Sequence, residues 1–178
     1  MKNRIIIRFI ALIAITVIFS YCKKPTEFKE IEVDNLFTLQ VPVYLHPTND
    51  LLPFNAPNIH QYEDSVGKIC LLVFDTSKAG IGVSSLKTFY DSMVVSPVMD
   101  SARILPPQLV KVDNDSTYQT EITGIMNNVR VFSEIETIAT KERYYFIQTW
   151  SSLDRRDKLK PDMLKMLNSF HDISHPQK

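Results

Sequence analysis

The feature that most constrains the fold of this chain is a series of strand-like segments in its second half, separated by very short turns. Residues 117–126 and 129–140 are joined at Asn127-Asn128, and asparagine tolerates the positive φ angles of a tight hairpin. A second turn at Lys141-Glu142 leads into residues 143–150. Because such short turns join antiparallel neighbours, the sequence predicts a three-stranded antiparallel meander at the centre of the fold.

The last strand of this meander carries apolar side chains on both of its faces. Strand alternation places Tyr144, Phe146 and Trp150 on one side. It places Tyr145 and Ile147 on the other side. Because each face carries apolar groups, we expect a covering layer on both faces of the sheet.

Further strands are predicted before the meander. Residues 69–74 read Ile-Cys-Leu-Leu-Val-Phe without alternation, which favours a strand covered on both faces. Within this run we expect Cys70 to be a buried small apolar side chain rather than a nucleophile, because its local sequence contains no basic group. Shorter strands are predicted at residues 37–42, 59–63 and 108–112.

Two segments have helical periodicity. Apolar residues at 86, 89, 90, 93 and 94 follow the spacing of one helical face, and Ser84 or Ser85 can cap this helix. The second helix lies near the C-terminus. Pro161 is tolerated if it lies in the first turn, but it would kink a helix that begins near Asp154. Its apolar stripe consists of Met163, Met166, Leu167 and Phe170.

The loop predicted at residues 46–57 contains large apolar side chains, which is unusual for an exposed segment. These are Leu51, Leu52 and Phe54. They either fold back as a lid on the sheet edge or form a surface for a partner. We therefore treat Leu51, Leu52 and Phe54 as candidate partner-contact residues.

The N-terminus has the pattern of an export signal. An uncharged apolar run at residues 9–19 follows positively charged residues, and it is short for a membrane-spanning helix. Cys22 comes next, and this order resembles the signal of a bacterial lipoprotein, whose cysteine becomes the lipidated first residue of the mature protein. Tyr21 departs from that pattern, because a small residue usually precedes the cysteine. The alternative is an uncleaved N-terminal anchor with an incidental cysteine.

Both alternatives place the remainder of the chain outside the cytoplasm, because positively charged residues stay on the inner side. By the same resemblance, Lys23 favours the outer membrane, since aspartate at this position retains lipoproteins in the inner membrane. The predicted organisation is a signal peptide at residues 1–21 and a lipidated N-terminus with a polar tether at 22–35. A single domain at 36–173 and a C-terminal tail at 174–178 follow.

The order of elements and the residues within them resemble a known superfamily. The matching segments are residues 37–45, 86–90, 121–124, 145–150 and 163–170. They resemble the Mog1/PsbP-like superfamily, which includes small bacterial lipoproteins. The resemblance implies an α+β fold with a central antiparallel β-sheet flanked by helices on both faces, an α/β/α sandwich. It also implies a binding or assembly role, because known members act by binding partners.

Composition and motifs argue against several functions. The chain has 20 Lys+Arg and 20 Asp+Glu without a basic cluster, so nucleic acid binding is not expected. There is no glycine-rich phosphate loop. His171 and His175 lie four residues apart, but at the C-terminus we expect them to be solvated rather than metal ligands.

We therefore expect no enzyme, cofactor or metal. The sequence predicts a membrane-anchored envelope lipoprotein, acylated with palmitate or a similar chain at Cys22, whose non-enzymatic binding or assembly domain has an unknown protein partner. The alternative is a carrier or sensor of a small apolar ligand, held in a cavity between sheet and helix.

Overall fold

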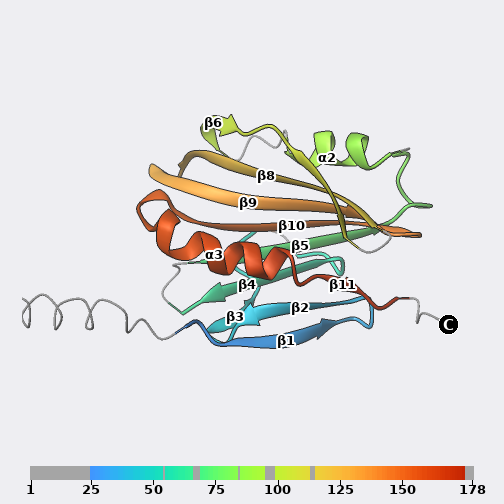
Figure 1. The fold of residues 1–178 in the computed structure, drawn as a ribbon, viewed down its shortest axis with the longest axis horizontal. Coiled ribbons are helices and arrows are strands. Elements are labelled where there is room, and N and C mark those ends of the chain that lie inside the picture. Colours follow the sequence, from blue (N-terminus) through green and yellow to red (C-terminus); the bar gives the residue numbers. More distant parts are fainter. Residues whose placement is uncertain are drawn as a thin grey trace, which may run out of the picture.

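The computed structural model shows a protein built mainly from β-strands in two antiparallel sheets (Figure 1). It describes residues 25–53, 55–65, 69–83, 85–94, 99–112 and 115–174. The large sheet has the order β3 (Leu45–Thr48), β4 (Ile59–Asp64), β5 (Cys70–Ser77), β10 (Arg143–Ser152), β9 (Val129–Ala139), β8 (Asp115–Met126) and β6 (Asp100–Ile104), with β7 (Gln108–Val112) also paired to β8. The small sheet has the order β1 (Phe28–Val33), β2 (Phe37–Pro42) and β11 (His171–Asp172).

The predicted meander is confirmed as the antiparallel series β8, β9 and β10 at the centre of the large sheet. Its first turn has φ angles of 51° at Asn127 and 64° at Asn128. Two successive positive φ angles match the right-handed twist of the flanking strands, and asparagine adopts them at low cost. The turn therefore sets the register in which Ile135 of β9 lies opposite Thr120 of β8.

The predicted α/β/α sandwich is wrong, because the protein is mostly β and has two antiparallel sheets. One face of the large sheet packs against the small sheet together with α3 (Arg156–Leu167), and the other face packs against α2 (Leu86–Val94). Part of the segment predicted as a polar tether is β1, which pairs with β2 along its whole length. Its strand pattern is weak in sequence, because Phe28 is out of phase with the alternating Ile31 and Val33.

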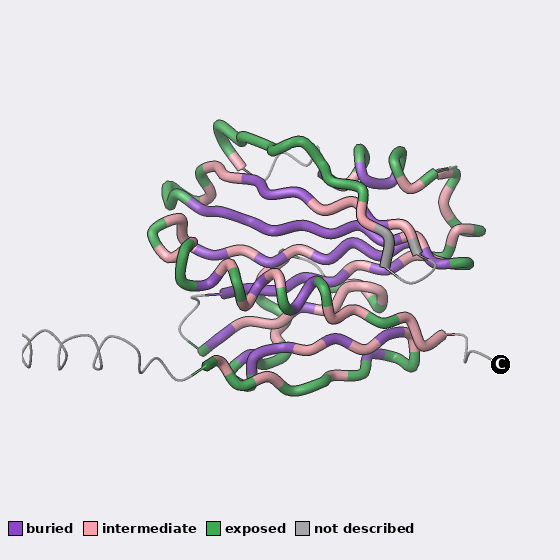
Figure 2. The backbone as a smooth tube through the Cα atoms, in the orientation of Figure 1, coloured by how far each residue is buried: buried purple, intermediate pink, exposed green. Residues whose placement is uncertain are grey.

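Two hydrophobic cores lie on opposite faces of the central strands, as the alternation in β10 predicts. Tyr145 and Ile147 belong to the core shared with the small sheet and α3. Tyr144 and Phe146 belong to the core beneath α2, and Trp150 packs against the same core. In Figure 2 the middle strands of the large sheet are accordingly the most continuously buried part of the backbone.

The two α-helices of the described residues differ at their N-terminal ends. Ser85 caps α2, since its Oγ accepts a hydrogen bond from the Thr88 backbone N–H at 3.1 Å. Pro161 lies inside α3 and not in its first turn, because the helix begins at Arg156, close to the earlier of the two predicted starts. Within the described ranges, neither helix is long and apolar enough to span a bilayer.

Candidate functional site: an exposed sheet edge and two buried polar clusters

The most exposed part of the large sheet is the edge formed by β6 and β7, which we call the β6–β7 edge. The two strands lie end to end along the same side of β8, and every residue from 101 to 109 is exposed (Figure 2). Among the described strands, none pairs with the outer side of β6 or β7. The sequence analysis predicted β7 and missed β6, because Asp-Ser-Ala-Arg-Ile has neither alternation nor enrichment in strand-forming residues.

Large apolar side chains project from this edge into solvent. Ile104, Leu105 and Leu109 are 43%, 38% and 59% exposed. Ile104 lies opposite Ile122, and Leu109 lies opposite Tyr118, so both are on the α2 side of the sheet. They extend the second core outward to the surface, where no described residue covers them.

The edge is irregular, but it is firmly attached to β8. Between the two strands, the Leu105 backbone N–H donates to the Glu121 carbonyl at 3.0 Å, and Thr120 Oγ1 donates to the Leu105 carbonyl at 2.6 Å. Pro106 and Pro107 follow, and neither has a backbone N–H. The row of outward-facing backbone N–H groups is therefore interrupted. A partner would bind mainly to the side chains of this edge and less by adding a strand to its backbone.

A cluster of ionic groups lies between the large sheet and α3. Glu121 of β8 is directly opposite Glu134 of β9. Arg156 donates three hydrogen bonds to Glu121: Nε to Oε1 at 3.1 Å and to Oε2 at 3.2 Å, and Nη2 to Oε2 at 2.6 Å. Lys160 Nζ lies 2.5 Å from Glu121 Oε2 and 2.9 Å from Glu134 Oε1. The cluster therefore ties two successive turns of α3 to two strands.

The two carboxyl groups of this cluster titrate in opposite directions. Burial opposes ionisation of Glu121, but hydrogen bonds from Arg156 and Lys160 outweigh it and lower its pKa. Burial raises the pKa of Glu134, and the single contact with Lys160 does not compensate for burial and the neighbouring carboxylate. Glu134 is thus the more readily protonated of the two carboxyl groups.

Glu136 is a further carboxyl group on this face, and no cation among the described residues pairs with it. Gln119 Nε2 lies 3.1 Å from Glu136 Oε1 and 2.9 Å from Asn168 Oδ1. Burial raises the pKa of Glu136 to about 7. Such a group could exchange protons at neutral pH, but Glu136 is only 2% exposed, so a substrate would not reach it.

A second polar cluster lies where the two sheets meet. Asp75 of β5 forms an ion pair with Arg143 of β10, and its Oδ2 lies 3.5 Å from His60 Nε2. His60 Nε2 is also 3.8 Å from Asp34 Oδ2, in the turn between β1 and β2. Burial opposes ionisation of Asp75, but hydrogen bonds with His60 and Arg143 outweigh it and lower its pKa. His60 therefore lies between acidic groups from both sheets.

The residues singled out by the sequence analysis do not meet in one site. Cys22 and Phe54 lie outside the described residues. Leu51 and Leu52 are half-buried; Leu52 packs against the second core, and its N–H donates to Gln61 Oε1 at 2.9 Å. Cys70 is buried, as expected, and burial together with Glu63 and Asp64 raises the pKa of its thiol to about 12.

Only one member of the histidine pair, His171, lies in the part of the chain that the structure describes. His171 is an exposed residue of β11 rather than of a helix, and His175 is outside the described residues. Within the described ranges, no three His, Cys, Asp or Glu side chains come together in a way that could hold a metal ion.

Sequence reasoning missed both polar clusters. The available signal was the alternation of Glu134 and Glu136 with apolar residues in a strand predicted to be covered on both faces. Carboxyl groups on a covered face need partners. Those partners come from β8 and α3, and no short-range pattern identifies them.

Comparison with known proteins identifies the fold. No family model matches the chain, and no curated protein matches its sequence. Among solved structures, PsbP from the cyanobacterium Synechocystis matches with a TM-score of 0.56 and 12% identity, over 85% of this chain and 95% of that chain. Mog1p, a Ran-binding protein from Saccharomyces cerevisiae, matches with a TM-score of 0.57 and 13% identity, over 84% of this chain and 97% of its own.

A third match is a bacterial protein. LpqN of Mycobacterium tuberculosis, a protein involved in cell envelope biogenesis, gives a TM-score of 0.51 and 9% identity, over 85% of this chain and 87% of that chain. At these identities the likeness shows the fold alone. The resemblance found in the sequence is therefore confirmed at the level of the fold.

Proposed function

We propose that this chain, which has the Mog1/PsbP-like fold, is a lipid-anchored protein of the bacterial cell envelope whose domain binds a protein partner and carries out no catalysis. The observation that carries the proposal is the exposed β6–β7 edge with the apolar side chains of Ile104, Leu105 and Leu109. Two structural neighbours support it, because one is a Ran-binding protein and another takes part in envelope biogenesis. We propose the β6–β7 edge, rather than the half-buried Leu51 and Leu52, as the main contact surface.

Physical reasons favour a protein as the partner of this edge. Apolar surface gains about 25 cal/mol per Å² when it is removed from water, so covering these side chains favours association. Leu109, the most exposed of them, projects from β7, which pairs with β8 alone among the described strands. Pro106 and Pro107 block uncontrolled strand addition, so recognition would rest on side-chain complementarity.

Two observations support a binding role over the alternatives. The ionisable groups that cluster in the described residues are largely buried and hold α3 and the small sheet in place, which leaves little for catalysis. The space between α2 and the sheet contains stacked aromatic rings. The centroid of the Phe89 ring lies 4.9 Å from that of Tyr144 and 6.5 Å from that of Phe74. Rings packed in this way disfavour a ligand cavity at that position.

The lipid anchor at Cys22 is tested by metabolic labelling with an alkyne analogue of palmitate. The wild-type protein should incorporate the label and sediment with membranes. Each CH₂ group of an acyl chain that enters the bilayer contributes about 0.8 kcal/mol to the free energy of membrane binding. The Cys22→Ser variant should lose the label. Retention of label in that variant would contradict acylation at Cys22, and separation of inner and outer membranes would test the preference indicated by Lys23.

The binding role is tested by affinity capture from detergent-solubilised native membranes. Leu109→Asp places a charge in the proposed contact and should remove the captured partner. Lys141→Asp is the control, because Lys141 is exposed and belongs to neither strand of the β6–β7 edge. If the two variants capture the same proteins as the wild type, this edge is not the contact surface.

A further inference from the structure

The first described residues of the chain are held against the domain at a defined place. Thr26 Oγ1 donates to Asp162 Oδ2 of α3 at 2.6 Å. The next residue, Glu27, accepts a hydrogen bond through its backbone carbonyl from the Val43 N–H at 3.0 Å. The chain therefore enters the fold between α3 and the connection from β2 to β3.

This connection consists of Val43 and Tyr44, and both are exposed. Val43 is 39% exposed and Tyr44 is 36% exposed. Burial of part of the ring, followed by the nearby Asp162 and Asp64, raises the pKa of Tyr44 to about 12, so its hydroxyl stays neutral. A tyrosine with an apolar ring and a neutral polar tip is suited to the boundary between water and lipid.

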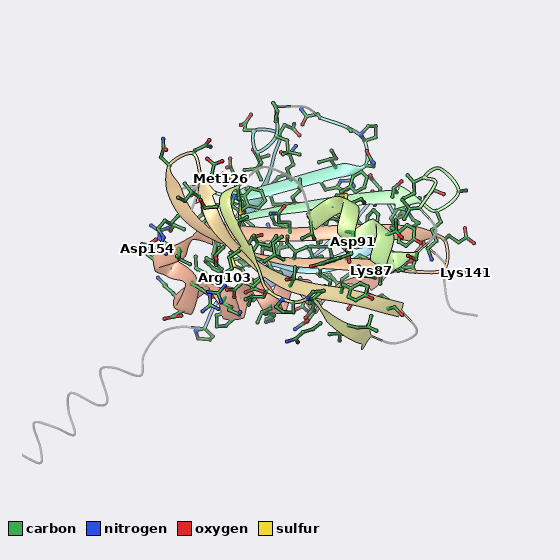
Figure 3. All side chains as sticks on the ribbon, turned by 90° about the horizontal axis from the view of Figure 1, so that it is seen from above. Lys87, Asp91, Arg103, Met126, Lys141 and Asp154 are labelled. Carbon is green, nitrogen blue, oxygen red and sulfur yellow. The ribbon has the colours of Figure 1, made fainter. Side chains whose placement is uncertain are left out.

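The same end of the molecule carries further exposed apolar groups. In Figure 1 the start of β1, the connection between β2 and β3, and the turn between β8 and β9 all lie at the left end. Figure 3 labels Met126 towards this end and Lys141 at the opposite end. The turn between β8 and β9 is flanked by Ile125 and Val129, which are 37% and 51% exposed.

The length of chain before the fold limits how far this end can lie from a lipid on Cys22. Only Lys23 and Lys24 separate Cys22 from Pro25. Three steps of fully extended chain span at most roughly 10 Å. The polar region on each side of a bilayer is itself roughly 5–7 Å thick. An acylated Cys22 would thus hold Pro25, and with it Val43 and Tyr44, close to the headgroups.

We propose that Val43 and Tyr44 form a membrane-docking surface, which contacts the phospholipid bilayer in which Cys22 is anchored. This inference rests on the lipid anchor of the proposed function. The contact is made by apolar and aromatic side chains, so it does not depend on anionic lipid. Docking orients the domain with its tethered end on the membrane. Leu109 stays in the aqueous phase, because it pairs with Tyr118 near the start of β8, whereas the end of β8 lies at the tethered end.

The proposal is tested with an environment-sensitive NBD probe on the full, acylated protein in phosphatidylcholine vesicles. Tyr44→Cys provides the labelling position, because Cys22 is acylated and burial raises the pKa of the Cys70 thiol to about 12, which suppresses its reaction. Leu109→Cys is the matched control: Leu109 is apolar and, at 59%, more exposed than Tyr44. Lys141→Cys marks the opposite end.

Spin-labelled phosphatidylcholine should quench the probe at position 44 at least about threefold more than at position 109 or 141. Val43→Cys should behave like Tyr44→Cys, which keeps the test valid if one variant folds poorly. Equal quenching at positions 44 and 109, in protein shown by mass spectrometry to be acylated and by flotation to be vesicle-bound, would overturn the docking surface alone. Absence of the acyl mass would overturn the anchor and, with it, the docking surface.

Discussion

Replacement of Glu136 by glutamine tests how the polar face beneath α3 contributes to stability. Glu136 is 2% exposed and has no cationic partner within the described residues, and burial raises its pKa from 4.5 to about 7. The folded protein therefore holds this proton more tightly than the unfolded chain. Between these two pH values the unfolded chain ionises first, so the free energy of unfolding falls as the pH rises through this window.

The size of this effect follows from the two pKa values. Each pKa unit corresponds to about 1.4 kcal/mol, so the difference between 4.5 and about 7 is worth about 3 kcal/mol. Glu136→Gln removes the titration and retains an oxygen that can accept the hydrogen bond from Gln119. The variant should gain about 3 kcal/mol relative to the wild type between pH 4 and pH 9.

The assay is urea-induced unfolding of the wild type and the variant at several pH values from 4 to 9. The quantity of interest is the difference in unfolding free energy between the two proteins, because titration of all other groups cancels in it to first order. Glu30→Gln is the control, since Glu30 is exposed on β1. A difference for Glu136→Gln that does not change with pH would refute the argument that a buried, unpaired carboxyl group titrates here.

Three further predictions concern the packing of the fold. Gly124→Val should destabilise the protein by about 1–3 kcal/mol, because a Cβ at this position would lie 3.0 Å from Met99 Cβ and 3.1 Å from the Asp100 carbonyl oxygen; an unchanged melting temperature would show that β6 does not depend on this close approach. Phe37→Ala should cost about 3–5 kcal/mol in urea unfolding, because the fully buried ring packs 5.6 Å from Tyr145, and a loss below about 1 kcal/mol would place it outside the core. Asp75→Asn should lower the free energy of unfolding by about 3–5 kcal/mol at pH 7, because it removes the charge opposite Arg143. Because the pKa of Asp75 is lowered in the folded protein, this loss should diminish as the pH falls below 4, and an equal loss at pH 3 and pH 7 would contradict the ion pair.

Much of the large sheet could be predicted because its signals are local. The Asn127-Asn128 turn and the alternation of Tyr144, Tyr145 and Phe146 depend on neighbouring residues only, and the structure has both as expected. Ser85 likewise caps α2, because a capping side chain acts within one turn of helix.

The layers of the fold were less predictable because they depend on distant contacts. Phe28–Val33 has a weak strand pattern, and it becomes β1 because β2 supplies its hydrogen-bond partners. Asp100–Ile104 has no strand pattern, and it lies on β8 where Gly124 allows close approach. The second layer is therefore a small sheet together with α3, whereas the family resemblance implied helices on that face.

The candidate site divides in the same way. Burial of Cys70 follows from its apolar neighbours and is confirmed. The exposure of Leu109 depends on the position of β7 at the edge of the sheet. That position follows from the pairing of β7 with β8, which is a contact between strands and not a local pattern. Local patterns thus indicated which segments form strands, but not which strand remains available to a partner.

Photocrosslinking in intact cells tests the central claim most directly. Benzoylphenylalanine is placed at Leu109 on the β6–β7 edge, and at the exposed Lys141 as a control position at one end of the sheet. If this domain is a binding module that uses the β6–β7 edge, irradiation should give a discrete crosslinked product in the membrane fraction from position 109 and not from position 141. The absence of a product from position 109, or identical products from both positions, would contradict the account.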